Sequence, residues 1–163
     1  MKRIIAAWPD EPLTKDTKIA AFIYAALLIV MVVSQLFSFE KFIPLLDSFN
    51  LPAPLSEYGL AVTLVICGVL ALPFLLRMKV SSGMRFVSMI AGWVVALAWL
   101  FLGLWLNVSG VVPETAGLLG ASVTLITGWW VVFVAIGFCV LAAWTAWGMW
   151  PLRRAQLETH RKK

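Results

Sequence analysis

Four long runs of apolar residues, none of which contains a charged side chain, constrain this chain more than any other feature. They cover residues 19–37, 58–76, 86–106 and 123–147. A helix that crosses the hydrocarbon core of a bilayer needs about 20 predominantly apolar residues. Unpaired backbone groups are too costly in hydrocarbon, and the runs lack the alternation of barrel strands, so they predict membrane-spanning helices.

The composition agrees with a protein that has little mass outside the bilayer. Hydrophobic residues make up 62% of the 163 residues and charged residues only 13%, whereas soluble domains average about 45–50% and about 25%. This balance excludes a disordered chain, which would be rich in charge, and argues against an ordinary soluble enzyme. We therefore expect a single transmembrane domain over residues 1–163.

The positions of the basic residues predict the topology. All of the 13 lysines and arginines except Lys41 lie before the first run, between the second and third runs, or after the fourth. Because cytoplasmic loops carry an excess of lysine and arginine, both termini are expected in the cytoplasm. The sequence thus predicts an all-α membrane protein, a four-transmembrane-helix bundle with N-in/C-in topology. We expect a multi-pass protein of a cell membrane, the bacterial cytoplasmic (inner) membrane.

A basic tail, residues 151–163, directly follows the last run. Basic tails can bind nucleic acid, but a tail beside the bilayer indicates contact with anionic lipid headgroups instead. The expected partners are therefore the lipid bilayer and other membrane or membrane-associated protein subunits, with no nucleic acid among them.

Residues 38–56, between the first and second runs, differ from an ordinary polar loop. Phenylalanines and leucines are interleaved with charges, and Pro44, Pro52 and Pro54 punctuate the segment. This pattern is typical of a short amphipathic helix or a hairpin at the membrane interface. The segment could be a lid or docking surface, or a passive cap over the bundle.

The order of features around this segment resembles a known family. The first run is followed by Phe39-Glu40-Lys41-Phe42 and a proline-containing outer segment, and the next run opens with Glu57 and Gly59 and ends at Leu76-Arg77. This order, over roughly residues 19–106, resembles the DoxX and MauE group of small four-helix membrane proteins. The resemblance implies an accessory or quinone-linked subunit of a membrane redox system, with quinone as a possible cofactor.

The runs lack the side chains that transport and catalysis in a membrane usually require. Charged and histidine side chains at depth mark proton relays and ion pathways, yet no run holds an Asp, Glu, Lys, Arg or His, and the single histidine, His160, lies in the basic tail. Haem ligation by bundle histidines and a core metal site of histidine and carboxylate ligands are therefore excluded. We expect no catalytic residue and no metal site, and a protein that is more plausibly not an enzyme.

The two cysteines, Cys67 and Cys139, lie near the middle of the second and fourth runs. If these two runs are neighbours, the thiols could form a buried redox pair or a link to a quinone. The alternative is that each cysteine is a small packing residue. Each lies on a stripe of small residues spaced by four, such as Cys67 and Ala71, which favours close helix packing.

The charged residues at the outer mouth form a second candidate site. Glu40 and Glu57 could bind a cation or a polar headgroup, and Lys41 could pair with either acid. Ordinary interfacial charge is the alternative.

Three functions follow from these observations. The first is a non-catalytic accessory or assembly subunit of a membrane redox system, similar to the DoxX group. The second is a carrier or pore for a small neutral or lipid-like molecule, which predicts a cavity among the helices that is reachable from residues 38–56. The third is a quinone- or thiol-linked membrane oxidoreductase.

Overall fold

The computed structural model describes residues 14–52, 56–111, 113, 115–121, 123 and 125–149. Over these residues the chain forms five helices: α1 (Lys15–Phe37), α2 (Phe39–Asp47), α3 (Glu57–Leu75), α4 (Ser82–Ser109) and α5 (Trp129–Gly148). All except α2 are long and apolar enough to cross a membrane. The described part is therefore that of an all-helical, multi-pass membrane protein, as the four charge-free runs predict.

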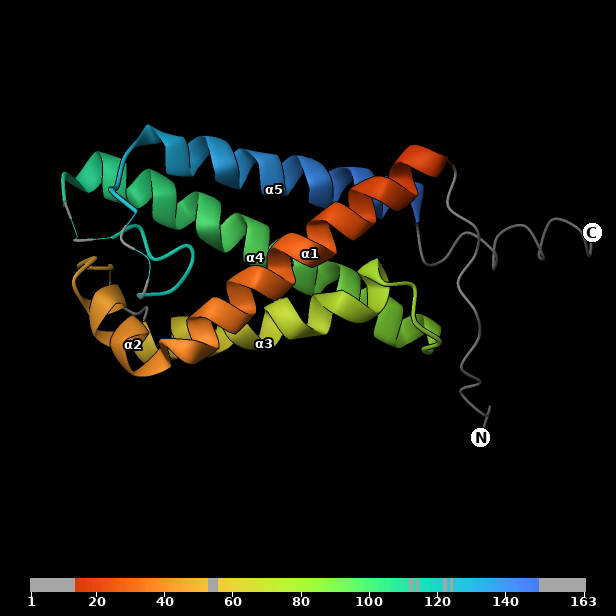
Figure 1. Ribbon diagram of the computed structural model, residues 1–163, viewed down its shortest axis with the longest axis horizontal. Coiled ribbons are helices and arrows are strands. Elements are labelled where there is room, and N and C mark those ends of the chain that lie inside the picture. The colour runs from red at the N-terminus through yellow and green to blue at the C-terminus, as the bar shows by residue number, and fades with distance from the viewer. Residues whose placement is uncertain are drawn as a thin grey trace, which may run out of the picture.

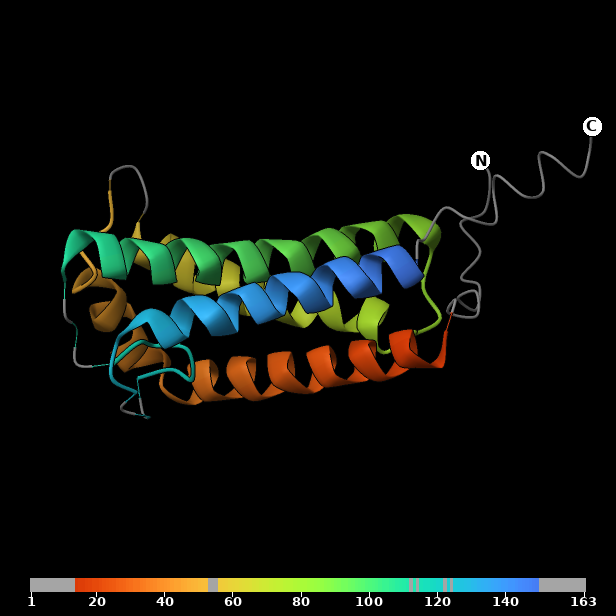
Figure 2. The ribbon, with the colours of Figure 1, turned by 90° about the horizontal axis from the view of Figure 1, so that it is seen from above.

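The four long helices form a bundle in which consecutive spans run in opposite directions (Figures 1 and 2). Helix α1 packs against α3 and α5, and α4 packs against the same two helices. The pairs α1–α3 and α4–α5 are thus neighbours, whereas α3 and α5 occupy opposite corners. The beginning of α1, the end of α5 and the α3–α4 turn share one end of the bundle, and α2 lies at the other. We call the α2 end the outer end.

The fourth helix begins later than predicted. The run was expected from residue 123, but α5 starts at Trp129, after the extended residue Gly128. The residues before it form a loop of their own, in which the N–H of Ala116 donates to the carbonyl oxygen of Leu125 at 2.8 Å. The first three predicted runs agree with α1, α3 and α4 within a few residues at each end. The predicted basic tail 151–163 and His160 lie outside the described residues.

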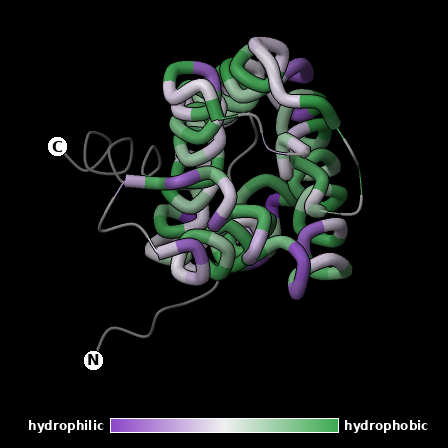
Figure 3. The backbone as a smooth tube through the Cα atoms, turned by 90° about the vertical axis from the view of Figure 1, so that its left-hand side faces the viewer, coloured by the Kyte–Doolittle hydropathy of each residue, from purple (hydrophilic) through white to green (hydrophobic). Residues whose placement is uncertain are grey.

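Hydroxyl side chains set the starting points of three of the long helices. Thr14, Ser56 and Ser81 each accept a hydrogen bond from the backbone N–H three residues later, at the starts of α1, α3 and α4. Such caps satisfy backbone donors that have no partner inside the helix. Hydrophobic residues dominate the lengths of the helices (Figure 3).

Small residues allow the helices to approach closely, as in other membrane bundles. A Cβ on Gly68 of α3 would overlap the Val32 side chain of α1, and a Cβ on Gly148 of α5 would overlap Thr17. On α3, the predicted stripe is buried only in part: Ala71 is fully buried and Cys67 is partly buried, while Gly68 makes the close approach to α1. A four-residue spacing drifts around a helix of 3.6 residues per turn, so residues at that spacing do not all stay on one face.

Pro73 interrupts the hydrogen-bond ladder of α3, and Ser88 of α4 fills the interruption. The backbone N–H of Phe74 donates to Ser88 Oγ at 3.0 Å, and the same hydroxyl donates to the carbonyl oxygen of Leu70. The serine thus stands between two groups that bond directly in a regular helix. This insertion joins α4 to α3 and satisfies two backbone groups at the buried contact between the helices.

Candidate functional site

Helix α2 packs its apolar face onto the protein. Phe42, Leu46 and the following Phe49 are fully buried, while Lys41 and Asp47 on the same short segment are exposed. The segment 38–56 was expected to contain an amphipathic helix or a hairpin, and it contains a helix. Its apolar side covers the outer end of the bundle, mainly over α3.

A second outer segment, residues 110–128, lies against α2 and is called here the α4–α5 loop. The N–H of Ala121 donates to Ser38 Oγ at 3.0 Å, at the junction of α1 and α2. The indole N–H of Trp105, near the end of α4, donates to the carbonyl oxygen of Phe49 at 3.0 Å. Gly117 has a φ of +73°, and a Cβ there would lie 3.1 Å from Leu45 Cδ2. These contacts join two segments that are far apart in the sequence.

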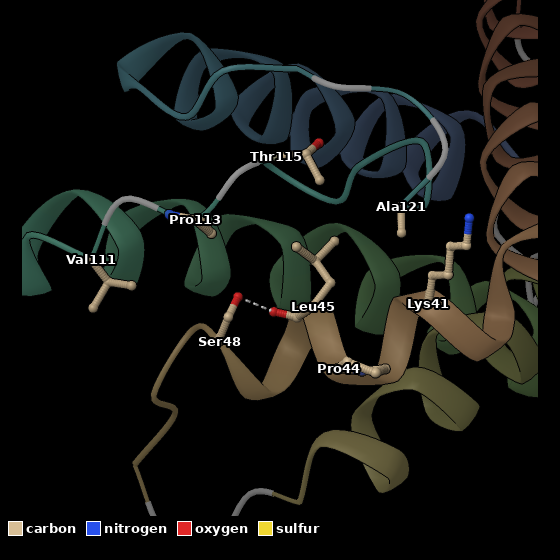
Figure 4. Close-up of a pocket in the computed structure, with 8 residues that line it drawn as sticks. All are labelled: Lys41, Pro44, Leu45, Ser48, Val111, Pro113, Thr115 and Ala121. Atoms are coloured by element: carbon tan, nitrogen blue, oxygen red, sulfur yellow. Dashed lines mark hydrogen bonds between the residues drawn. The ribbon is translucent and has the colours of Figure 1, made fainter.

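A pocket of about 510 Å³ lies between α2 and this loop, and we call it the outer pocket (Figure 4). One side comes from the α2 segment and the other from the α4–α5 loop. Its lining residues are Lys41, Pro44, Leu45, Ser48, Val111, Pro113, Thr115 and Ala121. Most of this lining is apolar, and the side chain of Lys41 reaches toward the segment of Ala121.

The two hydroxyls in the outer pocket already have partners. Ser48 Oγ donates to the carbonyl oxygen of Leu45 at 2.6 Å. Thr115 Oγ1 donates to the carbonyl oxygen of Val123 at 2.8 Å and accepts from the N–H of Leu125 at 3.2 Å. Among the described residues of the lining, Lys41 is the only one with a charged side chain, and no described residue forms an ion pair with it. Its ammonium is therefore available to an anionic group.

Glu40, Lys41 and Glu57, the charged residues predicted at the outer mouth, lie at the same end of the bundle but do not form a single site. The rings of Phe39 and Tyr58, each next to one of the two acids, lie 6.5 Å apart between centroids and edge-on. Within the described residues, Lys41 pairs with neither Glu40 nor Glu57, and of the three only Lys41 lines the outer pocket. Glu40 lines an adjoining pocket of about 440 Å³, which also includes Lys41.

Cys67 and Cys139 are free thiols on helices at opposite corners of the bundle. A redox pair was expected only if the second and fourth spans were neighbours. The corresponding helices, α3 and α5, do not pack extensively against each other. Both thiols are half-buried and pack against the apolar core. This placement agrees with a packing role for each cysteine.

Three of the polar side chains inside the bundle bond to backbone carbonyls, whereas Gln35 Nε2 and Trp99 Nε1 are buried without a hydrogen-bond partner among the described residues. The Tyr24 hydroxyl donates to the carbonyl oxygen of Gly92 at 2.7 Å, and Thr145 Oγ1 donates to that of Leu141 at 2.8 Å. A small cavity beside Tyr24, Ser88 and Thr145 measures about 10 Å³, close to the smallest space that holds one water molecule.

Sequence reasoning identified half of the outer pocket. Lys41, Pro44, Leu45 and Ser48 belong to the outer segment singled out above, whereas the lining residues of the α4–α5 loop were not identified as part of a site. The closely spaced Gly110, Pro113, Gly117 and Gly120 are the signal of an ordered loop. No protein family, no curated protein and no solved structure matches this chain.

Proposed function

We propose that this protein is a non-catalytic accessory or assembly subunit of a membrane redox system, the role that its resemblance to the DoxX and MauE group implies. The observation that supports this role best is that the cavity at the centre of the bundle measures only about 10 Å³. Tyr24, Ser88 and Thr145 all donate to backbone carbonyls, so the polar groups at the centre serve the fold. A bundle built in this way is expected to act through the surfaces that it offers to other subunits.

The proposed setting is a bacterial cytoplasmic membrane, with both termini in the cytoplasm. Lys15 and Lys18 begin α1, and Arg77, Lys79 and Arg85 flank the α3–α4 turn at the same end of the bundle. The outer end carries Lys41 together with Glu40, Asp47 and Glu57. This asymmetry is what the positive-inside rule associates with a cytoplasmic face.

The two other functions have less support. A carrier would need a route among the spans, but the outer pocket lies above them, between α2 and the α4–α5 loop. A thiol-linked oxidoreductase would need Cys67 and Cys139 to meet, but α3 and α5 stand at opposite corners.

Affinity purification at native expression level, from mild detergent and followed by mass spectrometry, tests the accessory role. A membrane oxidoreductase should be recovered with the tagged protein and should be absent when an unrelated four-span protein carries the same tag. Recovery of the protein without any such partner would overturn the proposal.

The topology is tested with single cysteines at the two ends of the bundle. In a background with Cys67→Ala and Cys139→Ala, the exposed residues Asp47 and Ser82 are replaced one at a time by cysteine. A membrane-impermeant maleimide should label Asp47→Cys in intact spheroplasts and Ser82→Cys only after lysis. The opposite pattern would reverse the orientation.

A further inference from the structure

The outer pocket combines one cation, which has no ion-pair partner among the described residues, with largely apolar walls. Lys41 supplies the charge, and the walls are formed largely by Pro44, Leu45, Val111 and Pro113. Its volume of about 510 Å³ falls within the range of roughly 300–1,000 Å³ in which proteins hold small molecules. A lysine ammonium is a compact point charge that suits phosphate groups.

The pocket is held open by contacts that do not involve a ligand. A Cβ on Gly120 would overlap Ser38 Oγ, and this hydroxyl also donates to the carbonyl oxygen of Ser34 at 2.8 Å. Trp105 ties the end of α2 to α4 through the carbonyl oxygen of Phe49. The walls are thus positioned before a ligand arrives, which lowers the entropic cost of binding.

The surroundings of Lys41 suit a ligand with a hydrocarbon chain. The adjoining pocket of about 440 Å³ shares Lys41 and continues along Leu36 and Phe37 at the end of α1. These two side chains are 53% and 88% exposed, at the end of a membrane-spanning helix. A head in the outer pocket would contact Lys41, while its chain would pass over Leu36 and Phe37 in the adjoining pocket, which Glu40 also lines.

We infer that the outer pocket binds an anionic amphiphile, a molecule with a phosphate-bearing head and a hydrocarbon chain, with Lys41 contacting the phosphate. This inference goes beyond the proposed accessory role and does not depend on it. The two proposals can fail separately. The pocket could bind the amphiphile in a protein that has no partner subunit, and a partner subunit could exist although the pocket binds no amphiphile.

Native mass spectrometry of the full chain in detergent, titrated with lipid, tests the inference. Dioleoyl phosphatidylglycerol should bind more tightly than dioleoyl phosphatidylcholine, which has the same chains but no net charge. Lys41→Gln should weaken phosphatidylglycerol binding by about tenfold, the loss expected for one charge-assisted contact. Lys18→Gln, an exposed lysine at the other end of the bundle, is the matched control and should bind like the wild type.

Two further arms identify what the pocket recognises. Ala121→Leu narrows the pocket without changing its charge and should also weaken phosphatidylglycerol binding. Inorganic phosphate should fail to compete at concentrations where dodecyl phosphate competes. Equal binding of the two lipids, equal effects of Lys41→Gln and Lys18→Gln, or equal competition by inorganic and dodecyl phosphate would each overturn the inference.

Discussion

Tyr24 of α1 donates its phenolic hydroxyl to the carbonyl oxygen of Gly92 in α4, at 2.7 Å, across the centre of the bundle. A Cβ on Gly92 would lie 3.7 Å from Tyr24 Cε1, an ordinary van der Waals distance, so the ring packs closely against α4 at this position. The same ring lies 6.2 Å from that of Phe138 in α5, measured between centroids. One buried side chain therefore connects three of the four spans.

Removing this hydroxyl should weaken the bundle without changing its shape. Tyr24→Phe deletes the hydrogen bond and keeps the ring contacts, so the expected loss of stability is about 0.6 kcal/mol and at most about 1.7 kcal/mol. Thermal unfolding in detergent measures the change. Tyr58→Phe is the control, because Tyr58 is 62% exposed and its hydroxyl supports no contact inside the bundle. Equal midpoints for the two variants would contradict the structural role of Tyr24.

A methyl group at Gly68 should be tolerated far less well than one at Gly137. A Cβ on Gly68 would overlap Val32 Cγ2, and valine is stiff at χ1, so α1 and α3 must separate. The expected cost of Gly68→Ala is about 1–3 kcal/mol. Gly137 has open space around its Cα, and Gly137→Ala should be neutral or slightly stabilising. Thermal unfolding of the two variants compares the effects directly, and equal midpoints would rule out the close approach at Gly68.

Pro73 and Ser88 should be energetically coupled. Ser88→Ala leaves the N–H of Phe74 and the carbonyl oxygen of Leu70 without their shared partner, at an expected cost of about 1–3 kcal/mol. In a Pro73→Ala background, α3 can become regular and these two groups can bond directly. The cost of Ser88→Ala should then fall, and a double-mutant cycle of unfolding free energies measures the difference. Additive effects would contradict the insertion.

The sequence predicts the spans well because their signal is local. Each span is a charge-free run of the right length, and Lys41 is the single basic residue on the outer side. The amphipathic nature of α2 is local in the same sense, since it depends on spacing within one helix.

The outer pocket was only half predictable because its walls depend on contacts over long sequence distances. The hydrogen bond from Ala121 to Ser38 and the approach of Gly117 to Leu45 join the α4–α5 loop to α2. No local pattern specifies such a pairing. The same reason leaves the order of helices around the bundle, and with it the separation of the cysteines, beyond sequence reasoning.

Gln35 of α1 should be replaceable by an apolar residue with a gain in stability. The side chain is 1% exposed, and its Nε2 has no hydrogen-bond partner. A buried donor without a partner costs about 1–3 kcal/mol. Gln35→Leu, which has a similar size, should therefore raise the unfolding midpoint in detergent. A lower midpoint would contradict this prediction and would show that the buried amide has a hydrogen-bond partner, such as a water molecule.

Oxidation of the native protein should not join Cys67 to Cys139, because their helices occupy opposite corners of the bundle. A positive control can be built into α3 and α4. A Cβ on Gly92 would lie 3.6 Å from Ala71 Cβ, within the separation of about 3.5–4.5 Å that disulfides require. With both native cysteines replaced by alanine, Ala71→Cys combined with Gly92→Cys should form a disulfide under copper–phenanthroline. The mobility shift on non-reducing gels is the measurement. A shift in the native protein, or none in the engineered pair, would refute the helix order.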